Sequence, residues 1–482
     1  MKFLFVYFIL LNIILLSKSK ELIFVELQSR HGARAPIGLG PQFQDLAGEI
    51  WDNIGELTGV GKRMEYVLGL RNRHRYITEY GFLSKKYDPH ELLVFSTNLN
   101  RTLLSMTSQL QGLYPMSEKY GENLNEDQLE KSEPSVNIEC DEIQEELTRL
   151  GNSSLPNYMT IIPIHMINPS EMKMSNYDYV DCKPKVEKIT NKNVNEKQTI
   201  KDLLENFKNK YSKNISEILP PNFEYNFDNI SKICDAAIAD YTEQRSLNNF
   251  FDKTQFNKSV FIEECFEIIK TNFRDKLYGD DNKEIILLEE STILRELIHY
   301  MKQRVDADIK GEKIEDNITD FSRPKMVIRS GHDTTLTAQI LFITHFFYLD
   351  YEYELPTYSA QTAFEVSRDK KKGNKKLEYF DYNVTYFFND RQILNIPLDT
   401  FINTIEKNIW TKEQIKKFCS GDISSDSDSG SNSSSLAILI GLITISLIAL
   451  ALLIVIIVLI IKISKKKHEG GYDLDNDKLL SE

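Results

Sequence analysis

The chain has 482 residues, of which 41% are hydrophobic and 11% are aromatic, and its formal net charge is −13. This composition excludes a largely disordered chain, and the length allows one large domain or two. The acidic balance argues against a nucleic-acid-binding protein, which needs a cationic surface, so any site for an anion must gather its positive charge locally.

Residues 1–19 have the pattern of a secretory signal peptide. Lys2 precedes a long apolar stretch, and small residues follow it, with cleavage expected after Ser19. The remainder of the chain is therefore expected to enter the secretory pathway.

Three short apolar runs in the body each precede a segment with helical spacing. They are Leu22–Leu27, Glu91–Thr97 and Lys325–Arg329. Apolar residues recur at three- and four-residue intervals in the segments that follow, which predicts helices. The order strand, helix, strand, helix is typical of a parallel sheet.

The polar region in the middle of the body interrupts this pattern. Residues 131–284, approximately, are rich in Lys, Asn and Glu and are predicted to be mostly helical. We therefore predict an α/β fold: a parallel-sheet core covered by helices on both faces, formed by about 20–130 and 285–420, with a helical insert or cap between them.

The C-terminal part has the features of a membrane anchor. Residues 421–435 form a Ser/Asp-rich stalk that has nothing to bury. Residues 436–461 are an uninterrupted apolar run, long enough for one transmembrane helix. Lysines follow it, so residues 462–482 are expected to be a cytosolic tail and residues 20–420 to be luminal or extracellular, as in a type I membrane protein.

Entry into the secretory pathway would allow cysteines to form disulfides and asparagines to be glycosylated. Five cysteines in an exported body predict up to two disulfides and one remaining thiol, and the residues alone leave the pairing open. The body also contains many N-x-S/T acceptors, so a glycoprotein is expected.

Charged clusters follow each of the three predicted strands. They are Arg30, His31 and Arg34, then Arg101, then His332 and Asp333. Ligands of open α/β sheets bind at the carboxyl ends of the strands, where these clusters would meet. Guanidinium groups bind phosphate oxygens, a neutral imidazole can act as a nucleophile, and a carboxylic acid can protonate a departing alcohol. The clusters together predict phosphoryl transfer.

The same residues resemble a known family. "RHGARAP", Arg30–Pro36, matches the RHGxRxP signature of the histidine acid phosphatases, and "GHDTTL", Gly331–Leu336, matches their HD motif. "LTGVG", Leu57–Gly61, resembles the LT-x-x-G helix start of that family. The resemblance covers most of residues 20–420, with the insert weakest, and it implies an acid phosphatase that acts on phosphate monoesters in an acidic lumen through a phosphohistidine.

The resemblance also implies roles for individual residues. The nucleophile would be His31 and the proton donor Asp333, and the residues that bind the substrate phosphate would be Arg30, Arg34, Arg101 and His332. No metal and no other cofactor is implied. The arginines are expected to lower the pKa of His31 and of Asp333. Gly32 would permit a tight turn behind the nucleophile.

The chain departs from the family pattern at two positions, and the family pattern also implies a disulfide. Asn98 replaces an aspartate that often precedes the arginine of the second cluster, and Gln361 replaces a cysteine of the vertebrate members. The family pattern implies a Cys182–Cys419 bridge. With the usual partner missing, Cys234 would pair with Cys265 and leave Cys140 free.

Other interpretations remain open at this point. The body could be a non-catalytic, membrane-anchored binding protein, although all six predicted residues are present. It could also be a phytase or another phosphatase of narrow specificity, which would need additional cations around the pocket. Asp333 could serve as a helix N-cap, with or without a catalytic role.

The cytosolic tail contains a sorting pattern. Asp475 precedes Leu479 and Leu480 at the spacing of the acidic dileucine signal, D/E-x-x-x-L-L, which clathrin adaptors bind. A lysosomal, endosomal or phagosomal membrane is therefore expected, with the cell surface as the alternative.

Overall fold

The computed structural model describes most of residues 20–420. Outside the described residues lie 1–19, 38–50, 52, 118–120, 133, 135–139, 167–181, 216–222, 245–256, 279–282, 313–322, 371–375 and 421–482. The predicted signal peptide, stalk, transmembrane helix and cytosolic tail all fall on these residues. In the described part of the chain, none of the helices combines the length and apolar character needed to cross a bilayer.

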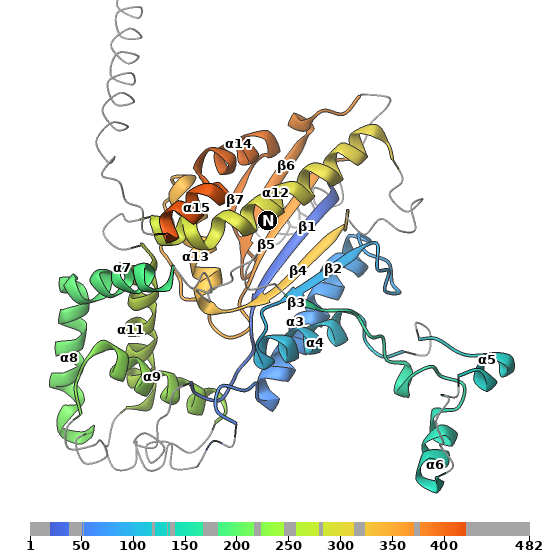
Figure 1. Cartoon of the computed structure of the whole chain (residues 1–482), viewed down its shortest axis with the longest axis horizontal. Helices are drawn as coiled ribbons and strands as arrows, with labels where there is room; N and C mark the ends of the chain where they lie inside the picture. Colours follow the sequence, from blue (N-terminus) through green and yellow to red (C-terminus); the bar gives the residue numbers. More distant parts are fainter. Residues whose placement is uncertain are drawn as a thin grey trace, which may run out of the picture. The chain divides into compact units, whose positions relative to one another are not determined.

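A seven-stranded sheet forms the centre of the unit that ends at Ser420 (Figure 1). In spatial order its strands are β3 (His165–Met166), β2 (Leu92–Ser96), β4 (Met326–Gly331), β1 (Lys20–Arg30), β5 (Gln361–Asp369), β6 (Tyr382–Phe388) and β7 (Arg391–Pro397). The first four are parallel to one another, whereas β5, β6 and β7 are paired antiparallel.

The prediction of a parallel sheet is therefore correct for one half and wrong for the other. A two-residue turn joins β6 to β7, and its residues Asn389 and Asp390 have φ values of 44° and 67°. Turns with positive φ at both central positions match the twist of antiparallel strands, and Asn and Asp tolerate that conformation. The sequence signal was thus present in "FFNDRQ", but it is local and lies outside the motifs that guided the prediction.

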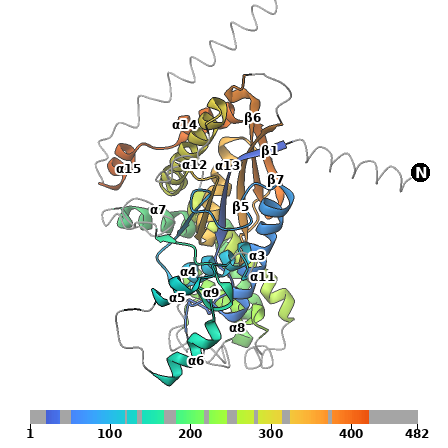
Figure 2. The same cartoon turned by 90° about the vertical axis from the view of Figure 1, so that its right-hand side faces the viewer.

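Helices cover both faces of the sheet, as predicted (Figures 1 and 2). Successive side chains of a strand point to opposite faces, so Phe24 of β1 packs with one cluster and Val25 and Leu27 with another. The first cluster includes side chains of α12 (Glu284–Lys310), α13 (Asp333–Phe346) and α14 (Leu398–Asn408). The second includes side chains of α4 (Asn100–Leu113) and of the π-helical turn His74–Glu79, which continues α3 (Gly59–Arg73).

The described part of the middle of the chain is mostly helical. Its helices are α5 (Glu126–Glu130), α6 (Asp141–Leu150), α7 (Lys183–Glu196), α8 (Gln198–Ile215), α9 (Phe227–Thr242) and α11 (Lys258–Tyr278). Side chains from α8, α9 and α11 form a separate apolar cluster that includes Phe207, Ile230 and Phe261. These helices therefore pack around an apolar core that is separate from the two clusters on the faces of the sheet.

Two disulfides tie the helices together, and they are the two that were expected. Cys182–Cys419 joins the start of α7 to the end of α15 (Lys412–Cys419), and Cys234–Cys265 joins α9 to α11. Cys140 is free and exposed.

The bridge across 237 residues should dominate the covalent stabilisation. Replacing Cys182 and Cys419 by serine should lower the free energy of unfolding by roughly 5 kcal/mol, because the unfolded chain regains the entropy of a long loop. Urea unfolding of the full-length protein measures this change. Cys140→Ser is the matched control and should have almost no effect, and equal losses in the two variants would contradict the assignment.

Candidate active site

The order of the parallel strands brings the three charged clusters together. β4 lies between β1 and β2, with Arg30 opposite Gly331 and Ser96 opposite Ser330. The residues that follow these positions leave the sheet at one edge. The backbone confirms the arrangement, since the N–H of His31 donates to the carbonyl of Gly331 and the N–H of Thr97 to that of Ser330.

His31 is almost fully buried, with 2% of its surface exposed, and its ring has a defined tautomer. Nδ1 lies 2.9 Å from the carbonyl oxygen of Gly32. A carbonyl only accepts hydrogen bonds, so Nδ1 carries the proton and Nε2 keeps its lone pair. Burial, followed by the charges of Arg30 and Arg34, holds the pKa of His31 well below its usual value. The direction agrees with the sequence analysis, but the main cause is desolvation.

Arg30 connects the start of α13 to the loop that precedes β5. Its guanidinium forms an ion pair with Asp333 at 2.7 Å and donates to the carbonyl of Pro356 at 2.8 Å. It also lies 4.4 Å from the centre of the Tyr358 ring, within cation–π range. These contacts hold the guanidinium of Arg30 in one orientation beside His31.

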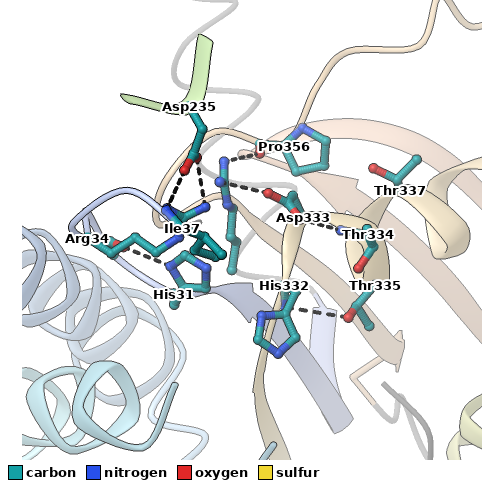
Figure 3. A network of polar contacts seen from close by, with 12 residues as sticks. His31, Arg34, Ile37, Asp235, His332, Asp333, Thr334, Thr335, Thr337 and Pro356 are labelled. Atoms are coloured by element: carbon teal, nitrogen blue, oxygen red, sulfur yellow. Dashed lines mark hydrogen bonds and ion pairs between the residues drawn. The ribbon is translucent and has the colours of Figure 1, made fainter. Parts of the chain in front are cut away.

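Arg34 has a partner that the sequence analysis missed. Asp235 of α9 accepts two hydrogen bonds from its guanidinium, at 2.9 and 3.2 Å, and a third from the backbone N–H of Ile37 at 2.7 Å (Figure 3). Only the fold brings the two residues together, because they are 201 positions apart. Nothing in the surrounding sequence, "KICDAAIAD", distinguishes Asp235 from the other acids of the insert.

Arg101 differs from the other two arginines because it forms no ion pair with a described carboxylate. Its Nε atom, like those of Arg30 and Arg34, is buried and lacks a hydrogen-bond partner. Burial, together with the nearby charge of Arg34, lowers the pKa of Arg101 to about 10, so the group stays charged below neutral pH. Without an ion pair to a described carboxylate, this charge is available for a ligand.

His332 caps the start of α13 and faces the end of β2. Its Nε2 lies 3.1 Å from Thr97 Oγ1, and its ring centre is 5.6 Å from that of His31. Burial and the charge of Arg101 lower the pKa of His332 to about 4, which keeps the ring neutral. A neutral ring can donate at one nitrogen, as the predicted role requires.

Asp333 is the first residue of α13, directly after the N-cap residue His332. Its Oδ1 accepts from the N–H of Thr334 at 2.8 Å, and its Oδ2 contacts Arg30. Burial favours the neutral acid, but the charges of Arg30 and Arg34 outweigh it, so the pKa of Asp333 is lower than usual. The N-cap interpretation of Asp333 is wrong, because His332 occupies the N-cap position of α13, whereas Asp333 faces the arginines.

Two glycines allow the first motif to lie directly against α3. A Cβ on Gly32 would come within 2.4 Å of the carbonyl oxygen of Gly61, and a Cβ on Gly61 within 2.0 Å of that of Ala33. The expected tight turn at Gly32 is therefore not the reason for glycine there. The requirement is close approach of two backbones, which also explains the glycine of "LTGVG".

The loop that precedes β5 lies beside His31, and the buried carboxyl group of Glu65 holds it in place. The N–H of Ser359 donates to the carbonyl of His31, and its hydroxyl donates to Glu65 of α3 at 2.8 Å. Glu65 has no exposed surface. Tyr358, next in the loop, lies against both Arg30 and His31.

A cavity of about 300 Å³ opens from Arg30, Arg34 and Asp333 toward α9 and α11. A larger one, of about 590 Å³, lies between α3 and β5 and includes none of the six predicted residues. We place the site at the smaller cavity, since only there do arginines, a carboxylate and the turn that carries His31 converge. Among the described residues, no group of three or more His, Cys, Asp and Glu side chains has a geometry suited to a metal ion.

Known proteins resemble this chain in sequence and in fold. A model of the histidine phosphatase superfamily (branch 2) matches residues 49–389, a range that begins after Arg34 and contains Arg101, His332 and Asp333. The prostatic acid phosphatase of Bos taurus is 24% identical over 329 residues, 67% of this chain and 68% of that protein.

Two further comparisons cover less sequence or show the fold alone. The lysosomal acid phosphatase of Xenopus laevis is 41% identical over 109 residues, 22% of this chain, so the match spans about a quarter of that curated relative's length. The phytase of Hafnia alvei, solved in complex with myo-inositol hexakis sulphate, has a TM-score of 0.51 and covers 81% of this chain and 98% of its own, at 14% identity.

Glu65 should make stability depend on pH. Burial raises its pKa to about 8, with the Ser359 hydrogen bond opposing, so the folded state keeps a proton that the unfolded state releases near pH 4.5. This contribution to stability is complete below about pH 4.5 and is lost as the pH rises toward 8.

Urea unfolding at pH 5 and pH 8 tests this linkage. Between the two, Glu65→Gln should lose less stability than the wild type, by on the order of 4 kcal/mol. Glu142→Gln, at an exposed position on α6, is the control. If the Glu65 variant and the wild type lost the same amount, the raised pKa would be refuted.

Proposed function

The chain belongs to the histidine phosphatase superfamily, branch 2, and on this premise we propose that it is an acid phosphatase that hydrolyses phosphate monoesters through a phosphohistidine. The observation that supports this most directly is the neutral His31 ring. Its Nδ1 proton is held by Gly32, and the arginines beside it can bind a phosphate while Nε2 attacks.

In the first step, Nε2 of His31 attacks phosphorus and the bond from phosphorus to the ester oxygen breaks. The three arginines stabilise the charge on the non-bridging oxygens as it develops. Asp333, in its protonated form, transfers its proton to the departing alkoxide, which leaves as the alcohol. The product of this step is phosphohistidine and a carboxylate.

In the second step, water attacks the phosphohistidine. The Asp333 carboxylate takes one proton from this water as the new bond to phosphorus forms, and the bond between phosphorus and Nε2 breaks. His31 returns to its neutral state, and inorganic phosphate leaves. Asp333 has then regained the proton that it needs for the next cycle.

Binding of the phosphate should itself prepare Asp333. In the free site the charges of Arg30 and Arg34 lower the pKa of this acid. A phosphate dianion on those arginines neutralises them, which should raise the pKa toward the ordinary value. The acid is still protonated only at low pH, so an acidic optimum is expected.

The proposed roles predict different losses for two substitutions. His31→Ala should abolish turnover. Asp333→Asn should slow an alkyl phosphate by roughly 10²–10⁴-fold, but p-nitrophenyl phosphate much less, because that leaving group needs little protonation. Steady-state rates between pH 4 and pH 8 measure both effects, and the loss of activity with rising pH should be weaker in the asparagine variant.

Asp399→Asn is the matched control, because Asp399 accepts from the N–H of Thr400 at a helix start just as Asp333 does from Thr334. It should change neither rate. Equal losses on the two substrates in Asp333→Asn would exclude Asp333 as the general acid.

We further propose that this enzyme is a type I protein of a lysosomal, endosomal or phagosomal membrane, with the body in the lumen. The curated relatives include lysosomal acid phosphatases, and the predicted low working pH suits such a compartment. Residues 436–461 would span the membrane, and the tail would present Asp475, Leu479 and Leu480 to a clathrin adaptor.

Replacing Leu479 and Leu480 by alanine should therefore shift the protein to the plasma membrane. Surface biotinylation and imaging of the full-length protein measure the shift. Leu474→Ala, in the same tail, is the control and should leave the distribution unchanged. If the double variant stayed where the wild type is, residence at the surface or in secretory vesicles would be the better assignment.

A further inference from the structure

The cavity beside Asp333 has an apolar wall that the proposed mechanism does not use. From the phosphate-binding end it extends between α9 and α11 and the loop before Tyr358. Its apolar lining residues are Ile37, Ile238, Phe266, Ile269, Phe273 and Leu355. Phe266 and Phe273 are only partly buried, so their rings still present surface to the cavity.

The charges of the cavity are balanced. Its lining cations and carboxylates form three pairs: Arg30 with Asp333, Arg34 with Asp235, and Lys232 with Asp228. The first two pairs lie at the phosphate-binding end. Among the described lining residues, Lys232 is the one cation farther along, and Asp228 pairs with it at 2.6 Å. Among the described residues that line this cavity, none offers an uncompensated positive charge to a ligand with several phosphates.

The size of the cavity suits one ring-sized group. About 300 Å³ is at the lower end of the range for small-molecule pockets, and a cavity of about 150 Å³ can hold benzene. A phosphate together with an aryl or similarly compact apolar group therefore fills it.

We propose that Ile238, Phe266, Ile269 and Phe273 receive the alcohol part of the substrate, so the enzyme selects phosphate monoesters of apolar, aryl-sized alcohols over polyphosphorylated ones. This inference rests on the proposed phosphatase function. It assigns specificity to the insert, whereas the chemistry stays at the edge of the sheet.

The full-length His31→Ala protein should not hydrolyse the substrate, so ligand binding to this variant tests the apolar wall separately from turnover. Titration calorimetry with benzyl phosphate, inorganic phosphate and phytate should show benzyl phosphate binding at least tenfold more tightly than either of the others. Tighter binding of phytate than of benzyl phosphate would overturn the inference. This measurement decides the question even if the wild type hydrolyses none of the esters.

Kinetics of wall variants provide the second test. Benzyl phosphate and glycerol 2-phosphate both release an alkyl alcohol, so their kcat/KM ratio isolates the wall from leaving-group chemistry. Phe273→Ala and Phe266→Ala should each lower this ratio roughly tenfold. Val260→Ala, exposed on the same helix α11, is the control and should change the ratio less than twofold.

The outcomes of these experiments separate the two proposals. An unchanged ratio in both phenylalanine variants would overturn the apolar wall while leaving the phosphatase intact. Failure of the wild type to hydrolyse either ester would count against the phosphatase, and the calorimetry would then decide on the wall alone.

Discussion

The position of β4 between β1 and β2, parallel to both, is the constraint on which the site depends. It places the ends of three strands, which are separated by up to 300 residues in the sequence, at one edge of the sheet. Because strands in a sheet are less than 5 Å apart, Arg30, Thr97 and His332 need no long loops to meet. The apolar clusters on both faces keep the sheet in this register, since a slip by one residue would turn Phe24 and Val25 to the wrong sides.

Collecting buried cations at this edge is costly, and the structure offsets the cost from outside the sheet. An unpaired buried charge is strongly destabilising, so each guanidinium needs a partner or an incoming ligand. Asp333 supplies the partner of Arg30, and Asp235, from the insert, that of Arg34. Arg101 has no such partner among the described carboxylates. The free site therefore has excess positive charge that a phosphate dianion would neutralise.

The sequence predicted the parts of this arrangement that are encoded locally. The strands, the helices that follow them, and the six candidate residues all have short signatures, and the resemblance implied the Cys182–Cys419 bridge. The antiparallel half of the sheet was missed because its clearest signal is a single Asn-Asp turn. Asp235 was missed because its importance arises only when α9 packs beside Ile37. Gly32 was predicted to permit a tight turn, but glycine is required there because a side chain would clash with the backbone of α3.

The proposed reacting groups belong to the core, whereas the proposed apolar wall belongs to the insert, so substrate specificity can change separately from the chemistry. The phosphate end is built on strand termini, where a small displacement would disturb Arg30, His31 and Asp333 together. Phe273 projects from α11 and takes no part in the apolar cluster of α8, α9 and α11, whereas Phe266 packs against that cluster. The side chain of Phe273 can therefore be exchanged without moving the reacting groups. Asp235 is the exception, because this residue of the insert holds Arg34 directly, and a change there would alter phosphate binding and the choice of alcohol at once.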